Sequence, residues 1–532
     1  MKKMKEEERM KKPKSMYLVV IAACCLCFMF LAGQGRDCTD NDGDGFAVEG
    51  DTCGNACGPV DCDDANPDVF PGAAEGPTGP TCSDGLDNDC DGLIDMNDTG
   101  CDSGTWQLIY QDPAGGTILE NAAIMARRLR GDFHNDLTLE AEYDYLLDGA
   151  VFIGADGGPD PVGKAGTILT IEAGTTIYGL SGTVPGMMSI ARGNQIMAEG
   201  TAVDPIVFTS ALPAGQRSRG DWGGLVINGR SPVNACPAGD CEGEGGSGYY
   251  GGSDPADDSG VLRYVRVEFA GHIFTSQNEL NGIAFQGVGD GTTVEYVQVH
   301  MNDDDGIEMF GGTVNMKYCL ITGCNDDQFD WTSGWQGKAQ FVAVQIYDDA
   351  ADRGIESDNL EEDHEAEPTS HPILSNFTFI GGSHAGSDAN QGILHRRGTE
   401  SEDYNFIVQG YFSSAVLDID DNATFDNIGA GTLVMENVLL YGEGATVIFD
   451  ESGRDPLDIS DWFLVQSGNA VVDPQLSDPY NQAAPDFKPQ AGSPALGSWV
   501  DPGDAFFDAV DFIGAMDDAD DWTAGWTTHD FN

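Results

Sequence analysis

Short apolar runs recur along residues 105–532, separated by glycine, asparagine and aspartate. From Gly260 onward the runs come in pairs. The first run of each pair begins at Leu262, Val294, Met316, Ala339, Leu374 or Tyr404. The second run begins at Gly282, Gly306, Gln328, Gly354 or Gly392. Runs of this length that are rich in β-branched and aromatic residues are typical of strands, and stretches with a helical period are scarce. The pattern therefore predicts a repeated unit of two strands.

The second runs start 24, 22, 26 and 38 residues apart. The shorter spacings match one coil of a parallel β-helix, and the longest leaves room for an inserted loop. A β-propeller is the rival architecture, but each of its blades needs four strands within about 40–50 residues. If the coils stack, apolar side chains at equivalent positions should form an inward ladder. Its members would be Ile283, Ile307, Phe329, Ile355 and Ile393.

Several stretches of this domain resemble a family of exported bacterial right-handed β-helix proteins of unassigned function. They are "TIEAGTTIYG", "GDWGGLVINGR", "YYGGSDPADDSGVLRYVRVEFAG" and "FIGAMDDADDWTAGWT". The stretch "FKPQAGSPALGS", Phe487–Ser498, resembles the closing motif of many bacterial β-helices. The resemblance implies export and an all-β fold, a right-handed parallel β-helix or solenoid with a C-terminal cap, over residues 105–532. It implies little about activity, because one fold serves many functions.

The first 35 residues have a different composition. Seven Lys/Arg and three Glu occupy the first 15 positions, and the uncharged segment Met16–Gly33 follows. This order is typical of a signal peptide, so we exclude residues 1–35 from the fold. Eighteen apolar residues are also close to a membrane span, which leaves an uncleaved anchor as the alternative. The stretch "IAAC", Ile21–Cys24, resembles a bacterial lipobox and would make Cys24 a lipidated first residue, although apolar residues continue to Ala32.

The 532-residue chain is strongly acidic, with a formal net charge of -64. Such a surface repels the phosphates of nucleic acids and of anionic membranes. We therefore expect no nucleic-acid partner, and contact with a membrane only through the N-terminal segment. The charge favours divalent cations as partners.

Residues 36–102 form a small acidic module with 18 acidic residues, one basic residue and seven of the 14 cysteines. Two of its stretches, "DNDGDGFAVEGD" and "DNDCDGLIDMND", carry aspartate at positions 1, 3, 5 and 12 and glycine at position 6. Calcium takes six to eight oxygen ligands, and a loop with this spacing wraps carboxylates around one ion. A solvated acidic linker is the alternative. The predicted ligands are Asp40, Asp42, Asp44, Asp51, Asp61, Asp63, Asp64, Asp87, Asp89, Asp91, Asp95 and Asp98.

The module also resembles a known motif. "DNDGDGF", "DCDDANPDVFPGAAE" and "CSDGLDNDCDGLID" are similar to the MopE-type metal-binding motif of exported bacterial proteins, and the loops are similar to thrombospondin type 3 calcium repeats. The MopE name implies copper as a cofactor. Carboxylates are hard ligands and the module has no histidine, so we expect calcium, with copper as the alternative.

Export favours disulfides, and zinc is the rival role for the cysteines of the module. Further along the chain, "CPAGDC" holds Cys236 and Cys241, and "CLITGC" holds Cys319 and Cys324. A small disulfide across a turn is expected for each pair. For Cys319, in the middle of a predicted strand, a buried free thiol is the alternative.

Acidic residues recur at one position of the β-helix repeat. The third residue of consecutive second runs is Glu308, Asp330 and Glu356. Further acids come just before each run. Stacking of coils at about 4.8 Å would align them in an outward ladder, which is unfavourable unless they are protonated, paired or bound to an ion. The predicted ladder comprises Asp305, Glu308, Asp327, Asp330, Asp352 and Glu356.

Three interpretations of the ladder stay open. One is a structural ladder neutralised by calcium or by pairing with arginine; Arg353, Arg396, Arg397 and His395 lie in or next to its columns. Another is a polysaccharide-binding groove, in which Trp331, Trp335 and Tyr347 serve as stacking platforms. The last is a polysaccharide lyase or glycoside hydrolase, whose catalytic candidates are Glu308, Asp330, Glu356 and Arg353.

We therefore expect an exported bacterial protein at the cell surface, associated with the outer membrane or extracellular. Its calcium-binding module precedes a long β-helix, and its role is binding or structural, in adhesion, a matrix or polysaccharide binding. The expected partners are divalent cations and a polysaccharide or another surface protein. A carbohydrate-active enzyme is the alternative.

Overall fold

The computed structural model describes residues 106–160, 166–182, 184–275, 278–349, 352–451 and 457–532, and the backbone of β1 (Ala47–Val48) and β2 (Val60–Asp61). The chain divides into two compact units, Met1–Pro71 and Gly72–Asn532. In the first unit, β1 pairs with β2 in parallel. The side chains of the predicted calcium ligands, the cysteines from Cys38 to Cys101 and the signal segment lie outside the described residues. Those assignments and the domain boundaries stay predictions.

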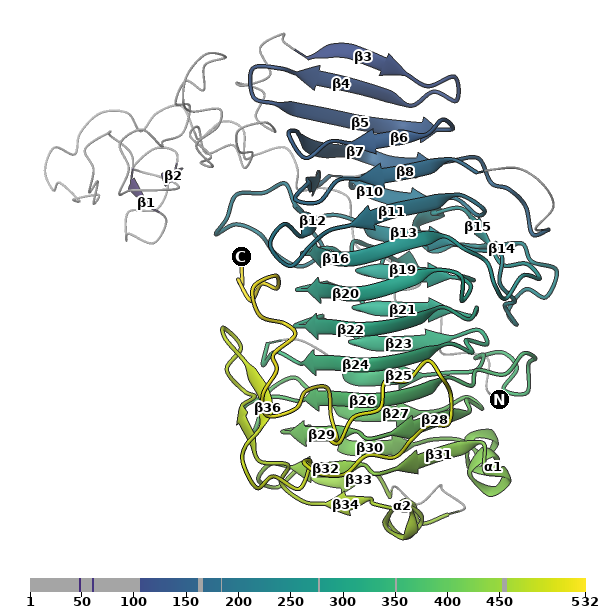
Figure 1. The fold of residues 1–532 in the computed structure, drawn as a ribbon, viewed down its shortest axis with the longest axis vertical. Coiled ribbons are helices and arrows are strands. Elements are labelled where there is room, and N and C mark those ends of the chain that lie inside the picture. Colours follow the sequence, from purple (N-terminus) through teal and green to yellow (C-terminus); the bar gives the residue numbers. More distant parts are fainter. Residues whose placement is uncertain are drawn as a thin grey trace, which may run out of the picture. The chain divides into compact units, whose positions relative to one another are not determined.

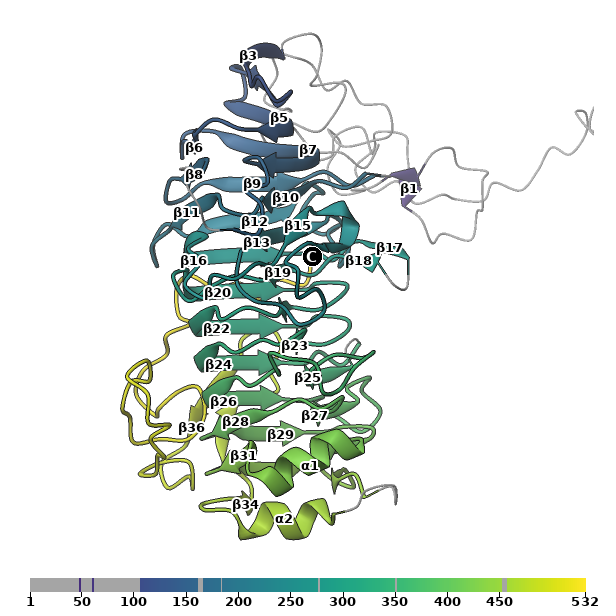
Figure 2. The ribbon, with the colours of Figure 1, turned by 90° about the vertical axis from the view of Figure 1, so that its right-hand side faces the viewer.

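The described part of the second unit is a parallel β-helix, as the sequence predicts (Figure 1). It opens with antiparallel pairing among β3 (Gln107–Gln111), β4 (Thr117–Asn121) and β5 (Ala126–Phe133). From β5 onward, strands of successive coils pair in parallel. Figure 2 shows the coils from the side, stacked one on the next. Among the described residues from β7 onward, the strands of the coils pair with their equivalents in neighbouring coils, so that no β-propeller blade is formed there.

Each coil contributes to three faces. The first face comprises β7 (Asp144–Ile153), β10 (Met187–Ile190), β13 (Gly224–Asn228), β19 (Ile283–Gln286), β21 (Ile307–Phe310), β23 (Phe329–Thr332), β25 (Arg353–Ser357), β27 (Gln391–His395), β30 (Ala415–Ile419) and β33 (Val447–Phe449). Five long strands run through both other faces: β16 (Gly260–Glu268), β20 (Thr293–His300), β22 (Asn315–Thr322), β24 (Lys338–Gln345) and β26 (Ile373–Ile380).

Shorter strands extend these two faces toward the ends. The second face also has β6 (Leu137–Leu139), β8 (Ile168–Ile171), β11 (Gln195–Glu199), β28 (Ser401–Tyr404) and β31 (Leu433–Glu436). The third also has the first part of β7, β9 (Thr176–Gly179), β12 (Ile206–Ser210), β29 (Ile407–Gly410), β32 (Leu439–Gly442) and β34 (Ala470–Val471). The remaining elements, β14 (Cys241–Glu242), η3 (Glu244–Gly246), β15 (Tyr249–Tyr250), β17 (Ile273–Thr275), β18 (Asn278–Glu279), α1 (Asn422–Ala430), α2 (Ile459–Val465), β35 (Leu476–Asp478) and β36 (Asp486–Pro489), lie in connections and near the C-terminal end.

The predicted inward ladder is confirmed. Ile283, Ile307, Phe329, Ile355 and Ile393 are register partners in successive coils, and all are fully buried. Steric contacts explain why glycine comes directly before the inward residues Ile307 and Ile393. A Cβ atom on Gly306 would lie 2.5 Å from the carbonyl oxygen of Gln328, and one on Gly392 would lie 2.4 Å from that of Val416. The close approach of the next coil therefore selects glycine at positions 306 and 392, whereas Gln328 occupies the equivalent position before β23.

The corner between the second and third faces carries one residue per coil in the left-handed region, with φ between 50° and 62°. These residues are Tyr264, Tyr296, Tyr318, Phe341, Asn376, Asn405 and Asn437. The rings of Tyr264, Tyr296 and Tyr318 stack with centroids 4.5 Å apart, and Phe341 continues the column at 4.9 Å. The asparagines continue it by hydrogen bonding, with 2.8 Å between Asn437 Nδ2 and Asn405 Oδ1.

The C-terminal segment after β36 returns along the outside of this corner (Figure 1; Figure 2). Side-chain amides of the coils hold its backbone. Gln298 exchanges two hydrogen bonds with Thr528, at 2.6 and 2.9 Å, and Gln340 exchanges two with Asp508. Apolar residues seal the contact, because Leu320 and Ala343 on the outer side of the third face pack in one cluster with residues of this segment. At Leu320 and Ala343 the third face is therefore apolar on both sides, whereas Gln298 occupies the same row in β20.

Of the two cysteine pairs, only one forms the expected disulfide. Cys236 and Cys241 are bonded, with their Cα atoms 5.5 Å apart across a turn closed by Gly239. The expected bond between Cys319 and Cys324 is wrong, because both are free and buried. Cys319 points inward from β22, which continues in extended form to Thr322. At a rise of about 3.3 Å per residue, this stretch carries the chain away from Cys319, and a disulfide needs Cα atoms within about 7 Å.

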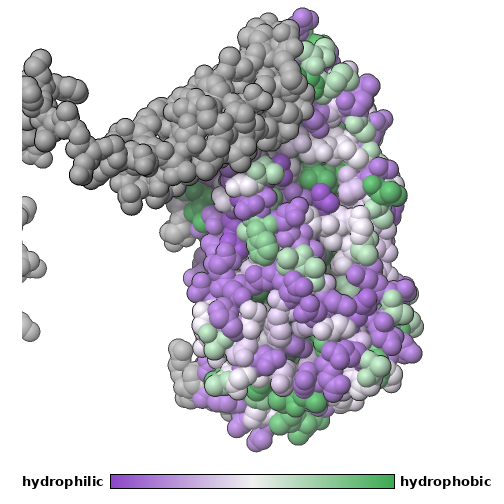
Figure 3. Space-filling view, turned by 90° about the vertical axis from the view of Figure 1, so that its left-hand side faces the viewer, coloured by the Kyte–Doolittle hydropathy of each residue, from purple (hydrophilic) through white to green (hydrophobic). Residues whose placement is uncertain are grey.

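The surface seen in Figure 3 is mainly hydrophilic, with an apolar patch toward its lower end. Near the last coils, the exposed apolar side chains include Val447, Leu464, Val465 and Val471. Among the described residues, no helix has both the length and the apolar character to cross a membrane.

The asparagine column gives a prediction for stability. Asn405 is fully buried, and its amide makes four hydrogen bonds of 2.8–2.9 Å, to Val500 N and O, Asn437 and Ser375. We expect Asn405→Ala to lower the free energy of unfolding by roughly 2–4 kcal/mol, because it leaves buried partners unsatisfied and places alanine in a left-handed conformation. Chemical denaturation measures the change. Asn422→Ala, at an exposed position of α1, is the control and should change stability by less than about 0.5 kcal/mol. Equal losses in the two variants would contradict the role of the column.

Candidate metal centre

A column of acidic residues follows the outer side of the first face. Glu308 on β21, Asp330 on β23 and Glu356 on β25 are register partners, as expected from the sequence. Ile307 and Met309, on either side of Glu308, point into the core. Residues alternate across a strand, so the acidic side chains point outward. They do not reach solvent freely, because Glu308 and Asp330 are each only 7% exposed.

The loops that lead into these strands add a second tier of carboxylates. The backbone N–H of Asp327 donates a 2.9 Å hydrogen bond to Asp305 Oδ1 in the preceding coil, so the loops stack as the strands do. Among the residues that the structure describes, three groups have carboxylate oxygens within 4.8 Å of one another. They are Asp304, Asp305 and Asp326; Asp305, Glu308 and Asp330; and Asp326, Asp327 and Asp352. Asp305 and Asp326 each belong to two groups, which makes the column continuous.

Arginines neutralise one end of the column. Arg353 Nη1 lies 3.1 Å from Asp327 Oδ2, 2.8 Å from Asp352 Oδ2 and 2.5 Å from Glu356 Oε1. Arg396 contacts Glu356 at 2.5 Å and Asp358 at 2.9 Å. The expected pairing with arginine is therefore present around Glu356.

The other end has no such compensation. In the described part of the chain, Asp305, Glu308 and Asp330 form no ion pair with lysine, arginine or histidine. Asn281 donates a 2.5 Å hydrogen bond to Glu308 Oε2. Asp330 Oδ1 and Asn281 Oδ1 are buried and have no hydrogen-bond partner among the described residues. A buried acceptor without a partner costs about 1–3 kcal/mol, and more when it is charged. Ionised carboxylates at this end would therefore have no balancing positive charge among the described residues.

The pKa values of these carboxyl groups reflect the lack of a positive partner. Burial raises the pKa of Asp305, Glu308 and Asp330 well above the usual range, and the neighbouring carboxylates raise each of them further. Burial, together with Glu279 and Asp326, also raises the pKa of Asp304 to about 8. A divalent cation among these oxygens would reverse the effect, because a bound ion is the largest local charge in such a site.

The donor set fits a hard cation. The three groups consist only of aspartate and glutamate, and the amide nitrogen of Asn281 donates to Glu308 beside them. Calcium takes such oxygens, six to eight at a time, whereas copper and zinc favour imidazole and thiolate. Within the described residues, the three groups could therefore hold a metal ion, and their oxygen donors are of the kind that hard cations prefer.

The structure adds residues that the sequence did not single out as ligands. Asp304 and Asp326 stand beside predicted members of the ladder, and their spacing of one coil is the signal that identifies them. Asn281 comes from the preceding coil and has no comparable signal. Glu244 of η3 lies close enough to Asp304 and Glu308 to raise the pKa of both, and burial raises its own pKa to about 7.

The covering loop that carries Glu244 is held firmly on the coils. The disulfide Cys236–Cys241 closes its first part. Arg192, 1% exposed, donates 2.8 Å hydrogen bonds to the carbonyl oxygen of Gly251 and to Asp156. Tyr250 packs edge-on against Phe310 of β21, with the ring centroids 6.2 Å apart. This loop shields the unpaired end of the column from solvent.

The expected stacking platforms for a polysaccharide are wrong, because Trp331, Trp335 and Tyr347 are all fully buried. Trp331 alternates with Asp330 and so points inward, where its indole N–H donates to Thr399 Oγ1 at 3.0 Å. Tyr347 packs against Phe531 of the returning C-terminal segment. None of the three rings is available to a ligand.

A serine, a histidine and an aspartate inside the coil are hydrogen-bonded in the same sequence as a hydrolase triad, but a substrate cannot reach them. Ser357 Oγ lies 2.7 Å from His395 Nδ1, and His395 Nε2 lies 3.0 Å from Asp403 Oδ2. All three side chains are fully buried, and Ser357 donates to the carbonyl oxygen of Leu394. Their role is to satisfy one another in the core, so this arrangement supports no hydrolytic activity.

A separate half-buried cluster makes stability depend on pH. His371 Nδ1 lies 2.9 Å from Glu400 Oε2, and its Nε2 lies 3.4 Å from Glu402 Oε1. The contact with Glu402 raises the pKa of His371 and lowers the pKa of Glu402. The stabilisation by His371 is complete below its unfolded pKa of about 6.5 and is lost as pH rises through its raised folded pKa. That by Glu402 is present above about pH 4.3 and is lost as pH falls through its lowered folded pKa.

We therefore expect the melting temperature of the wild type to fall more steeply above pH 6.5 than that of His371→Asn. Thermal denaturation at a series of pH values measures the two slopes. His384→Asn, at an exposed histidine, is the control and should retain the wild-type slope. Parallel curves for the wild type and His371→Asn would contradict the assignment.

Comparisons with known proteins agree with the fold and with the module. The family profile described as "Pectate-lyase like beta helix domain" matches residues 131–470, more than half of the chain. The profile described as "Putative metal-binding motif" matches residues 61–96, which confirms the resemblance to the MopE type. No curated protein and no solved structure gives a significant match.

Proposed function

Because the chain belongs to the family of pectate-lyase-like β-helix domains and carries a MopE-type metal-binding motif, we propose that it is an exported cell-surface protein that binds calcium and has a binding or structural role. The observation that carries the proposal is the convergence of Asp305, Glu308 and Asp330, with Asp330 Oδ1 buried and without a partner. A calcium ion there completes the column.

A comparison of the two ends of the column favours a bound ion, rather than protonation of the carboxylates, as the way in which the charge of the column is neutralised. Where arginines are within reach, the carboxylates pair with them at 2.5–3.1 Å. Where no arginine is within reach, the oxygens still converge within 4.8 Å instead of turning apart. Backbone carbonyls or water supply the further ligands that calcium needs. The ion would take the place that Arg353 has at the other end.

Export and surface location are supported by features outside the column. The N-terminal segment has the composition of a signal peptide, and the acidic, cysteine-rich module follows it. The disulfide Cys236–Cys241 in the covering loop suits an oxidising compartment. In this proposal the module and the column respond to the same ion, and the β-helix is the rigid part that presents a binding surface.

The test compares the response of the free energy of unfolding to calcium in the full-length wild type and in Asp330→Asn. At a calcium concentration about 100-fold above the dissociation constant, one site adds about 2.7 kcal/mol. We expect Asp330→Asn to lose the part of the calcium-dependent stabilisation that comes from this site. In the presence of a chelator the same variant should be more stable than the wild type, since it removes a buried carboxylate that has no partner.

Two further variants separate the sites. Glu362→Gln removes one exposed carboxylate and should keep the full response to calcium. Asp89→Asn, in the module, should reduce bound calcium without changing the share that Asp330→Asn removes. A wild-type melt that calcium and chelator leave unchanged would refute the proposal.

A second candidate function is a carbohydrate-active enzyme, and the pectate-lyase-like description of the family favours it. The residues that would act are Glu308, Asp330, Glu356 and Arg353. Two of them are engaged in ion pairs with each other and with further residues, because Arg353 contacts three carboxylates and Glu356 contacts two arginines. These ion pairs favour the structural role.

Incubation with polygalacturonate and calcium should therefore give no increase in the ultraviolet absorbance of unsaturated products. Reducing-end assays on the same mixture check for hydrolysis. Product formation that Asp330→Asn abolishes, and that Glu362→Gln retains, would establish the enzyme instead.

A further inference from the structure

Three stretches of the sequence have an asparagine followed, two positions later, by threonine. They are Asn97–Thr99, Asn376–Thr378 and Asn422–Thr424. This tripeptide is the acceptor for N-linked glycans in exported proteins. In bacteria the acceptor also has an acidic residue two positions before the asparagine. Asp420 meets this condition for Asn422, and Asp95 meets it for Asn97, which lies outside the described residues.

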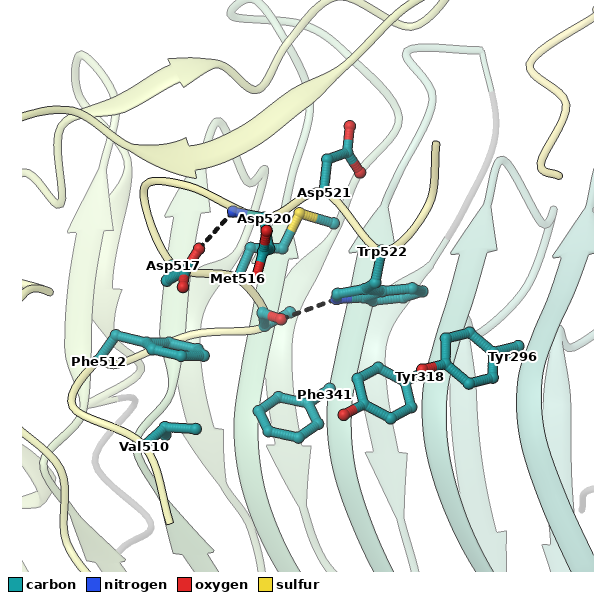
Figure 4. Close-up of a pocket in the computed structure, with 11 residues that line it drawn as sticks. Tyr296, Tyr318, Phe341, Val510, Phe512, Met516, Asp517, Asp520, Asp521 and Trp522 are labelled. Carbon is teal, nitrogen blue, oxygen red and sulfur yellow. Dashed lines mark hydrogen bonds between the residues drawn. The ribbon is translucent and has the colours of Figure 1, made fainter. Parts of the chain in front are cut away.

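The fold leaves no room for a glycan at Asn376, and the residue two positions before it is Leu374. Asn376 is fully buried, and its Nδ2 donates to the carbonyl oxygens of Phe512, at 3.0 Å, and Gly514, at 3.2 Å. Figure 4 shows the C-terminal segment at this corner, where it also encloses a cavity of about 460 Å³ beside Trp522, and Asn376 does not line that cavity. A glycan on Asn376 would therefore keep the C-terminal segment from closing on the coils.

Asn422 meets the opposite conditions. It is the first residue of α1 and is exposed, and Figure 2 shows α1 on the outside of the stacked coils. Among the described residues, the side-chain amide of Asn422 has no hydrogen-bond partner. Asp421 caps the helix instead, because its Oδ1 accepts from the backbone N–H groups of Ala423, at 2.9 Å, and Thr424, at 3.1 Å. A glycan on Asn422 would displace no side-chain contact that the structure describes.

Thr424 determines when a glycan can be attached. The threonine hydroxyl is part of the acceptor that a transferase recognises, but Thr424 is fully buried. Its Oγ1 accepts a 2.9 Å hydrogen bond from the backbone N–H of Gly398 and lies 3.2 Å from Asp421 Oδ1. Phe425, 5% exposed, packs in the core beside it. A transferase can therefore reach Thr424 only before α1 packs on the coils, while an exported chain is still unfolded.

We propose that Asn422 is the acceptor of an N-linked glycan that is attached before the β-helix closes. The donor is an oligosaccharide linked to a polyprenyl pyrophosphate. Nδ2 of Asn422 forms a bond to C1 of the first sugar and loses one proton to a base of the transferase. The bond between C1 and the pyrophosphate oxygen breaks, and the pyrophosphate leaves with the electron pair. The inference rests on the export proposed above and does not depend on calcium.

The test produces the full-length chain, with its own N-terminal segment, in a bacterial host that carries an oligosaccharyltransferase and a lipid-linked oligosaccharide of known mass. A protease that cleaves before aspartate releases residues 421–425, so mass spectrometry of this peptide reads Asn422 alone. We expect the exported chain to carry one oligosaccharide on this peptide. An exported chain without it would overturn this proposal alone, and a chain retained in the cytoplasm would overturn it together with export. The response to calcium is measured separately and decides neither outcome.

A matched pair of variants separates recognition of the acceptor from the general acidity of the chain. Asp420→Asn and Asp426→Asn each remove one carboxylate near Asn422, but only Asp420 is two positions before it. We expect Asp420→Asn to reduce the modified fraction at least about fivefold, because it removes a charge-assisted contact with the transferase. Asp426→Asn, at an exposed position of α1, should leave the fraction unchanged. Equal fractions in these two variants, or a modified peptide in Asn422→Gln, would overturn the proposal.

The burial of Thr424 gives a test of the timing. The same transferase is added to the unmodified full-length protein, either folded or diluted from denaturant directly into the reaction. We expect the folded protein to be modified at least about tenfold more slowly, because Thr424 becomes accessible only when α1 opens locally. Equal rates for the two samples would contradict attachment before closure.

Discussion

Each coil of this β-helix lies directly on the next, so that equivalent side chains meet at the spacing of hydrogen-bonded strands, about 4.8 Å. The constraint is favourable for Ile283, Ile307 and Ile355 inside the coil and for the rings of Tyr296 and Tyr318 at the corner. It is unfavourable for Glu308 and Asp330 outside the coil. The same stacking therefore builds a core, an aromatic strip and a column of mutually repelling carboxylates, and the last of these needs a positive partner.

The positive partner differs along the column. Arg353 and Arg396 reach Glu356 and its neighbours, whereas Asp305, Glu308 and Asp330 converge beneath a loop that the disulfide Cys236–Cys241 and Arg192 hold in place. A rigid cover and a buried acceptor without a partner are what distinguish this end from an ordinary acidic surface. This contrast within one column is the physical basis of the calcium site proposed for the β-helix.

Local periodicity was sufficient to predict much of this structure. The spacing of coils gave the solenoid, the inward ladder and the stacking of Glu308, Asp330 and Glu356. The burial of Trp331 also follows from the alternation of side chains along β23. Because Phe329 points inward and Asp330 points outward, Trp331 must point inward. The strand pattern likewise accounts for the free thiol of Cys319. Cys319 points inward from an extended strand, and an extended strand cannot make the turn that a disulfide to Cys324 needs.

The remaining features depend on contacts between distant parts of the chain. Tyr347 is buried by Phe531, and Gln298 binds Thr528, across separations that no repeat length reveals. The cavity beside Trp522 exists only because the C-terminal segment returns along the coils. Likewise, Asn281 and Glu244 join the acidic column from loops whose paths the sequence pattern does not fix.

The most direct measurement is an anomalous difference map from crystals of the full-length protein grown with calcium. The account predicts a peak among the carboxylate oxygens of Asp305, Glu308 and Asp330, with Asp330 Oδ1 as one of its ligands. A map without density there, in which these side chains turn apart into solvent or share protons with one another, would contradict it.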